Sequence, residues 1–156
     1  MIYNIFFIFL VVVALVCVVG IATADFRRRI IPDAYLFPLM LTGLLLLAFY
    51  PYPISLPAAA VGGAFGYALS ATVGFVFDYF LRRRDSNALS PIGMGDIKLI
   101  GVGGLWLGAT GLAIALVVAC LTGAVWARTK KQQYIPFAPF FLLGGILALI
   151  GIVFLL

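Results

Sequence analysis

Long, nearly uncharged apolar segments are the feature that most constrains how this chain can fold. The chain of 156 residues is 65% hydrophobic and only 10% charged, whereas about a quarter of the residues in a soluble domain carry charge. A bilayer core of about 30 Å needs about 20 residues of helix. Backbone amides in lipid must be paired within their own segment. Because the runs are continuous rather than short and alternating, we expect an all-α, polytopic membrane protein.

Basic residues follow the apolar runs in three clusters, Arg27–Arg29, Arg82–Arg84 and Arg128–Lys131. Such clusters mark cytoplasmic loops, so we interpret the net charge of +5 as topological and expect no nucleic-acid partner. Alternation then predicts about six transmembrane helices with both termini outside. Their expected ranges are 5–24, 34–49, 56–81, 93–107 (beginning between 93 and 98), 109–127 and 139–156.

The first apolar run ends in Ala22-Thr23-Ala24, which resembles a signal-peptidase site. The run lacks a preceding basic residue and is long for a signal sequence. Cleavage would also leave the cluster Arg27–Arg29 outside, against the positive-inside rule. We therefore expect a retained helix, and one membrane-embedded domain over residues 1–156. The abundant glycines on these helices suit close helix packing.

The side-chain inventory excludes several catalytic mechanisms. The chain has no histidine, and Cys17 and Cys120 form no C-x-x-C pair. A zinc protease therefore lacks its usual ligands. A Ser-His-Asp or Cys-His mechanism lacks its base. We expect neither a metal nor a cofactor.

Two aspartates are expected at the cytoplasmic boundary of the membrane. Asp25 ends the first apolar run and Asp96 lies in Gly93-Met94-Gly95-Asp96, at the start of the fourth. Ionisable residues at membrane depth are costly, so each is a candidate for function. Two carboxyls in a partly dry site can act as general acid and general base. Gly93 and Gly95 would leave room for an extended substrate.

Structural explanations exist for both aspartates, and others apply to the remaining acids. Asp25 could balance the neighbouring arginines, and Asp96 could cap a helix. Asp78 precedes Arg82 by one helical turn, which predicts a surface ion pair. The remaining predictions are a solvated loop position for Asp85, the N-cap of the second helix for Asp33, and charge balance or substrate contact for Lys98, with charge balance preferred.

Three motifs together resemble the type IV prepilin peptidases. Gly93-Met94-Gly95-Asp96-Ile97-Lys98-Leu99 resembles their G-x-G-D-x-K-L signature, and Asp25 to Asp33 resembles their first catalytic stretch. The segment Ile135-Pro136-Phe137-Ala138-Pro139-Phe140 is similar to their I-P-F-G-P-F block, with Ala138 where glycine is usual. The resemblance implies an intramembrane aspartic endopeptidase using Asp25 and Asp96. Further candidates for substrate binding or for shaping the site are Gly93, Gly95, Lys98, Pro136, Phe137 and Pro139.

The same resemblance implies the substrate and the location. Such enzymes remove the basic leader of prepilin-like membrane proteins at the cytoplasmic face of the inner (cytoplasmic) membrane. Many bacterial members carry a cytoplasmic region with two C-x-x-C pairs and methylate the new amino terminus. That region is missing after the first helix here, so cleavage without methylation is expected. This compact form resembles both tight-adherence (Flp-type) and archaeal preflagellin peptidases; we favour the bacterial pilus.

Other classes of function remain open from the residues. A presenilin-like protease shares G-x-G-D, but its first aspartate usually follows tyrosine, and here Asp25 follows Ala24. A small ion- or proton-coupled carrier would use intramembrane carboxylates, normally near the midplane and within internal repeats. A silent assembly factor would tolerate the loss of either aspartate.

Overall fold

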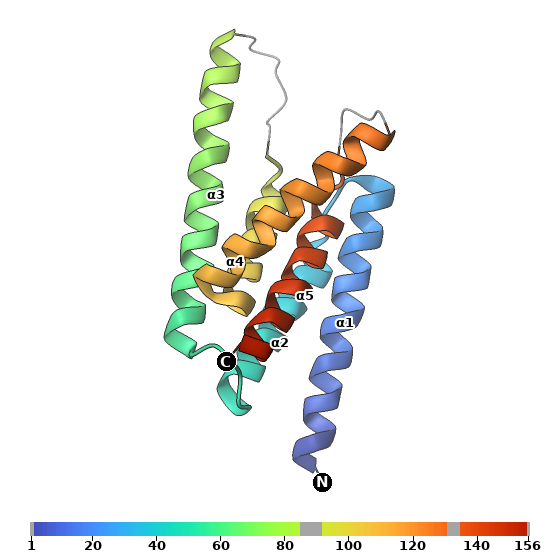
Figure 1. Cartoon of the computed structure of the whole chain (residues 1–156), viewed down its shortest axis with the longest axis vertical. Coiled ribbons are helices and arrows are strands. Elements are labelled where there is room, and N and C mark those ends of the chain that lie inside the picture. Colours follow the sequence, from blue (N-terminus) through green and yellow to red (C-terminus); the bar gives the residue numbers. More distant parts are fainter. Residues whose placement is uncertain (1, 85–91, 131–134, 156) are drawn as a thin grey trace.

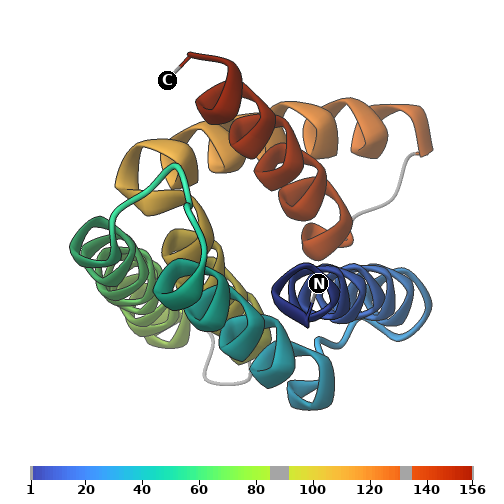
Figure 2. The same cartoon turned by 90° about the horizontal axis from the view of Figure 1, so that it is seen from below.

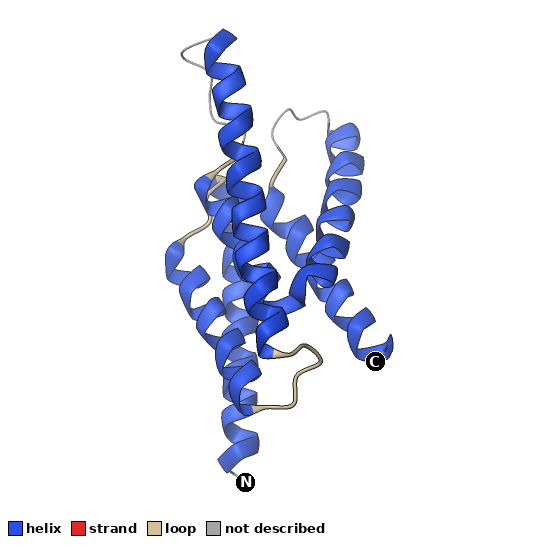
Figure 3. Cartoon of the chain, turned by 90° about the vertical axis from the view of Figure 1, so that its left-hand side faces the viewer, coloured by secondary structure: helices blue, strands red, loops and turns tan. Residues whose placement is uncertain are grey.

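The computed structural model describes residues 2–84, 92–130 and 135–155, and over these ranges it is entirely helical (Figures 1 and 3). The helices are α1 (Ile2–Arg28), α2 (Asp33–Phe49), α3 (Leu56–Arg84), α4 (Met94–Lys130) and α5 (Phe137–Leu155). In the described part of the chain, the four helices α1, α3, α4 and α5 are long and apolar enough to cross a membrane. The shorter α2 is also apolar, with 17 residues. The all-helical class is therefore confirmed, and the count of six spans stays a prediction.

Helix α4 is broken at Gly108, which is where the sequence predicts a boundary between two helices. Gly108 has φ 65° and ψ −180°, a conformation that only glycine adopts without strain. The first part of α4 runs downward in Figure 1, and the part after the break returns upward beside α5. Both ends of α4 therefore lie at the same end of the bundle.

The basic residues gather at one end of the molecule. Helices α1, α3 and α4 each carry arginine or lysine in the last turn, and all three helices end toward the top of Figure 1. Both chain termini lie toward the opposite end. This arrangement agrees with the expected placing of the basic clusters, while the orientation of the termini across a membrane remains a prediction.

Helix α4 lies at the centre of the packing, in contact with α2, α3 and α5 (Figure 2). Its approach to α3 depends on glycine. A Cβ atom on Gly104 would collide with the carbonyl oxygen of Gly62, and one on Gly62 would lie 2.7 Å from the Cα atom of Gly108. Backbones that approach this closely gain van der Waals contact that larger side chains would prevent. The glycines therefore have the packing role that the sequence predicts.

Aromatic side chains hold the end of the bundle opposite the basic residues. The Tyr52 hydroxyl donates to the Trp106 carbonyl at 2.9 Å, close to the Gly108 break, where helical hydrogen bonding is interrupted. Burial raises the pKa of the Tyr52 hydroxyl, which keeps it a donor. The Trp106 indole donates to the Leu39 carbonyl at 3.0 Å. These bonds connect α2 and the loop after it to α4.

Two helix boundaries differ from the sequence expectation in a way that affects the candidate site. Helix α1 continues to Arg28 instead of ending near Ala24, so Asp25 lies in its last turn. Helix α5 begins at Phe137 instead of Pro139. Hydropathy locates the apolar part of a helix but not its polar or proline-containing ends.

We expect Gly104→Ala to destabilise the protein by about 1–3 kcal/mol, because backbone atoms of α3 cannot move aside as a side chain can. The higher helix propensity of alanine recovers about 1 kcal/mol at most. The control is Gly151→Ala, whose added Cβ atom would meet nothing within 4 Å. Denaturation in detergent, followed by circular dichroism, measures both; equal stability of the two variants would contradict the packing at Gly104.

Candidate active site

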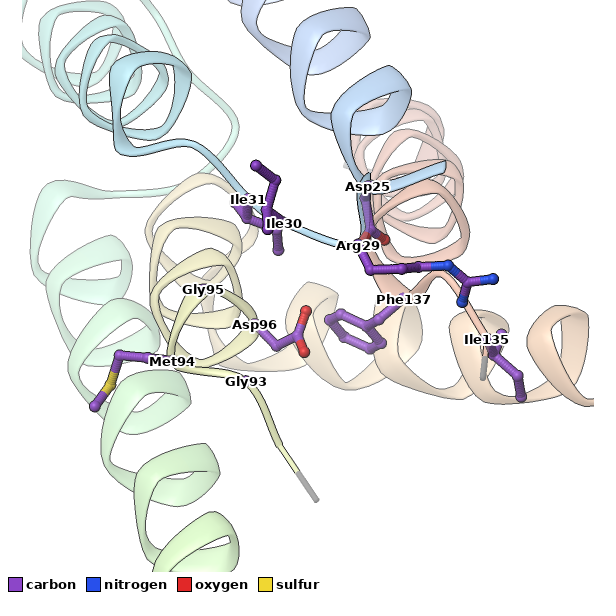
Figure 4. A pocket seen from close by; sticks show the side chains of 10 residues that line it. All are labelled: Asp25, Arg29, Ile30, Ile31, Gly93, Met94, Gly95, Asp96, Ile135 and Phe137. Atoms are coloured by element: carbon purple, nitrogen blue, oxygen red, sulfur yellow. The ribbon is translucent and has the colours of Figure 1, made fainter. Parts of the chain in front are cut away.

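A cavity of about 420 Å³ lies among the end of α1, the segment after it, and the first turns of α4 and α5. It contains both aspartates singled out by the sequence, and Figure 4 shows their carboxyl groups directed into it. The lining residues are Asp25, Arg29, Ile30, Ile31, Gly93, Met94, Gly95, Asp96, Ile135 and Phe137. Segments far apart in the sequence thus meet at the end of the bundle that carries the basic residues.

Asp25 is held by the first turn of α5. The residue is 5% exposed, and its Oδ2 atom accepts a hydrogen bond from the backbone N–H of Ala138 at 2.9 Å. Free amides and the positive end of the helix dipole make a helix N-terminus a good site for a carboxylate. The segment Ile135 to Phe140 therefore contributes to the site through its backbone as well as its side chains.

Arg29 turns the chain at the end of α1 and lines the same cavity. Its φ of 55° is left-handed, and its N–H donates to the Asp25 carbonyl at 3.0 Å, as in a helix C-cap. The positive charge of Arg29 acts on the Asp25 carboxyl. Part of the expected charge balance between Asp25 and the arginines is thus present, from an exposed arginine that lines the cavity.

Asp96 lies in the first turn of α4. The backbone amide of Gly93, just before the helix, acts on its carboxyl group, and the capping role considered from the sequence stays a prediction. The charge of Asp25 acts on Asp96 across the cavity. Two carboxyls that line one partly buried cavity ionise together less easily than two separate ones. The arrangement is thus compatible with acid–base chemistry by a carboxyl pair.

The close pairing of the two segments depends on Gly95. A Cβ atom there would lie 2.9 Å from the Cβ atom of Ile31. Ile31 belongs to the segment that joins α1 to α2, and Gly95 precedes Asp96. Glycine at this position therefore lets the segment after Asp25 cross directly over the start of α4.

Phe137 is fixed in the cavity wall by a ring stack. Its ring packs on Phe141 with centroids 5.3 Å apart, and Figure 4 shows it directed into the cavity. Phe141 is 2% exposed and lies against Gly103, where a Cβ atom would come within 2.5 Å of the ring. The apolar wall beside the carboxyls is therefore a rigid part of the α4–α5 contact.

Three residues predicted to shape the site do not line the cavity. Pro136 is fully buried, and Pro139 lies in the first turn of α5. Lys98 forms an ion pair with Asp33 at 2.8 Å, which agrees with the preferred role in charge balance. The described lining does include the predicted Gly93, Gly95 and Phe137.

The predictions for the other acids have mixed outcomes. Asp33 is not the N-cap of α2, because that position is held by Pro32, whose ring has no polar atom to make a side-chain cap bond. The Asp33 carboxylate pairs with Lys98 instead. The expected pair of Asp78 and Arg82 is confirmed at 2.7 Å. Asp85 lies outside the described residues.

Sequence reasoning missed several contributors to the cavity. The sequence marks Arg29 as a topological charge and a possible counter-charge to Asp25, but not as a lining residue. Ile30, Ile31, Met94 and Ile135 carry no chemical signal of their own. Ala138 stands out in the sequence only as a departure from the usual glycine, because a backbone donor leaves no trace in a pattern of side chains.

Comparison with known proteins gives a consistent result. The profile described as the type IV leader peptidase family matches residues 5–128, most of the chain. Proteins named prepilin leader peptidase/N-methyltransferase are similar: 30% identical over 139 residues in Dickeya chrysanthemi, 30% over 134 in Xanthomonas campestris pv. campestris and 28% over 133 in Burkholderia pseudomallei. These matches cover 81% to 85% of this chain but only 41% to 47% of the relatives. No solved structure matches the chain significantly.

We expect Gly95→Ala to destabilise the protein by about 1–3 kcal/mol, because the Ile31 backbone segment must move to admit the new methyl group. Gly93→Ala is the matched comparison. Its Cβ atom would lie 3.2 Å from the Asp96 Oδ2 atom, a side-chain end that can rotate, so a loss of about 1 kcal/mol or less is expected. Denaturation in detergent measures both, and a Gly95→Ala variant as stable as wild type would contradict the crossing.

Proposed function

Because the chain belongs to the type IV leader peptidase family, we propose that it is an intramembrane aspartic endopeptidase that removes the leader peptide of type IV prepilin-like proteins. The observation that carries this proposal is the single cavity holding both Asp25 and Asp96. Burial, the Ala138 amide and the mutual charge effect make this pair suited to acid–base work. The proposed catalytic residues are Asp25 and Asp96, with Gly93, Gly95 and Phe137 forming the walls.

The proposed reaction is hydrolysis by a carboxyl pair that shares one proton. The ionised carboxyl takes a proton from water, and the resulting hydroxide adds to the carbonyl carbon of the scissile bond. The protonated carboxyl gives its proton to the carbonyl oxygen, which forms a neutral diol. As the diol collapses, the carboxylate that had given up its proton takes one back from a diol hydroxyl, which becomes the new carbonyl. The carbon–nitrogen bond breaks, and the leaving nitrogen takes up the proton that the other carboxyl gained from water. Both carboxyls then return to their starting states.

We place the cavity at the cytoplasmic face of the inner membrane. It lies at the end of the bundle where α1 and α4 carry their basic last turns, and such residues favour the cytoplasmic side. A substrate whose leader is cytoplasmic and whose next segment is an apolar helix would present its scissile bond at this depth. The lipid bilayer and a prepilin-like membrane protein are the proposed partners.

Within the family we favour precursors of Flp-type (tight-adherence) pili. Support comes from the short connection between α1, which carries Asp25, and α2. Only residues 29–32 lie between the two helices. We also propose that residues 1–156 cleave without methylating. Cys17 and Cys120 lie on different helices and cannot form the C-x-x-C pairs associated with the methylating region.

Asp25→Asn and Asp96→Asn should each abolish cleavage of a co-expressed prepilin-like precursor, because neither variant retains an acid and a base. A fall of at least about a hundredfold is expected from the loss of one acid–base group. The wild type should show a bell-shaped pH profile, since the pair must carry one proton. Precursor and mature forms separated by electrophoresis give the measurement.

Asp78→Asn is the matched control, because Asp78 lies in an ion pair on α3 and away from the cavity. It should cleave normally. Full cleavage by either Asp25→Asn or Asp96→Asn would contradict the dyad, whereas a wild type that cleaves nothing but still supports assembly after either substitution would favour a silent assembly factor. A carrier would instead show ion- or proton-coupled transport that the same substitutions abolish, without cleavage in the wild type.

Residues 1–156 should leave the new amino terminus of the cleaved pilin unmethylated. Purified protein in detergent, supplied with precursor and S-adenosylmethionine, should release mature pilin of unmodified mass. Mass spectrometry of the mature amino terminus gives the measurement. A gain of one methyl group that depends on S-adenosylmethionine would contradict this part of the proposal and leave the peptidase assignment unaffected.

A further inference from the structure

We propose that Lys98 and Asp33 form a clamp that holds the two catalytic segments in register, so that both are positioning residues for the dyad. This inference rests on the proposed peptidase function. The Lys98 Nζ atom donates to both carboxylate oxygens of Asp33, at 2.9 and 2.8 Å. We call this pair the α2–α4 clamp.

Each member of the clamp lies near one of the proposed catalytic aspartates along the chain. Lys98 follows Asp96 by two residues in the first turns of α4. Asp33 opens α2, immediately after the short segment that leads from Asp25 and Arg29. The clamp therefore joins the chain that carries Asp25 to the chain that carries Asp96, beside the cavity rather than within it.

The apolar contact between Gly95 and Ile31 does not by itself prevent the two segments from sliding along each other, and the clamp adds a second contact that limits this motion. At Gly95 the two segments touch through the Ile31 side chain, and dispersion contacts of this kind are not directional. The ion pair adds a polar contact that persists only while the Lys98 ammonium stays within hydrogen-bond distance of the Asp33 carboxylate, which limits how far α2 can shift along α4. Together the two contacts fix how close the segments lie and how far one has slid past the other.

Neither clamp residue lines the cavity that holds the dyad. Lys98 does reach a second, apolar cavity of about 360 Å³ between α2, α3 and the first part of α4. A direct role for Lys98 in that cavity would not require Asp33. The dependence on both partners is therefore what distinguishes a clamp from a contact made by the lysine alone.

The clamp should influence catalysis more than overall stability. The Lys98 and Asp33 side chains are 35% and 47% exposed, and exposed ion pairs contribute little to folding. The geometry of reacting groups, in contrast, is sensitive to displacements of an ångström. Loss of the clamp should thus lower turnover while leaving the protein folded and able to bind precursor.

The experiment compares Lys98→Met, Asp33→Asn and Lys98→Arg in the full chain, in detergent, with a purified prepilin-like precursor. It also includes the single reversals Lys98→Asp and Asp33→Lys, and the reversed pair that combines them. Lys98→Met and Asp33→Asn should each lower kcat about tenfold with KM changed less than about twofold. Lys98→Arg should keep most of the activity. The reversed pair should recover to within about threefold of wild type, short of full recovery because a cation in the first turn of α2 opposes the helix dipole.

Arg82→Met is the matched control, because it breaks a comparable exposed ion pair with Asp78 on α3 and should leave kcat unchanged. Denaturation in detergent should give similar stability for all variants. The clamp is overturned if Asp33→Asn cleaves like wild type, if the reversed pair is no better than the single reversals, or if KM alone changes. A wild type that cleaves nothing, with Asp25→Asn indistinguishable from it, would instead overturn the proposed function.

Discussion

The buried carboxyl group of Asp25 is the group around which the candidate site is built. Asp25 lies in the last turn of α1, where the dipole of its own helix opposes a negative charge. The first turn of α5 offsets this by aiming the Ala138 amide at the carboxyl, and Arg29 adds a positive charge nearby. Helix α5 therefore stabilises the Asp25 carboxyl electrostatically, in addition to packing against the other helices.

Glycine brings the second carboxyl to the first. The contact of Gly62 with Gly104 lets α3 and α4 approach at backbone distance, and Gly103 admits the Phe141 ring from α5 on another side of α4. At the start of the same helix, Gly95 admits Ile31. The glycines thus let the neighbouring segments pack closely around the first part of α4, and this packing places Asp96 at the cavity.

Much of this arrangement could be predicted from the sequence, because its causes are local. Uncharged runs predict helices, the boundary predicted between residues 107 and 109 coincides with the break in α4, and two isolated aspartates at run ends predict a shared site. The Ala138 amide and the Asp33 pair could not be predicted in the same way. The first is a backbone donor without a side-chain signal. For the second, the capping preference of Asp33 pointed to its own helix, and a tertiary partner, Lys98, took precedence.

The two ends of the bundle are held by different forces, and this difference bears on how the site could work. The far end is tied by uncharged bonds such as that from Tyr52 to the Trp106 carbonyl. At the cavity end, charged groups make the ties: Asp25 to the α5 amide, and Lys98 to Asp33. The Asp25 bond lies in a buried site, where charge-assisted hydrogen bonds are strong, whereas the Lys98–Asp33 pair is already partly exposed to water. Under the proposed function a substrate would enter at this end, and water that came in with it would weaken mainly the bond that holds Asp25.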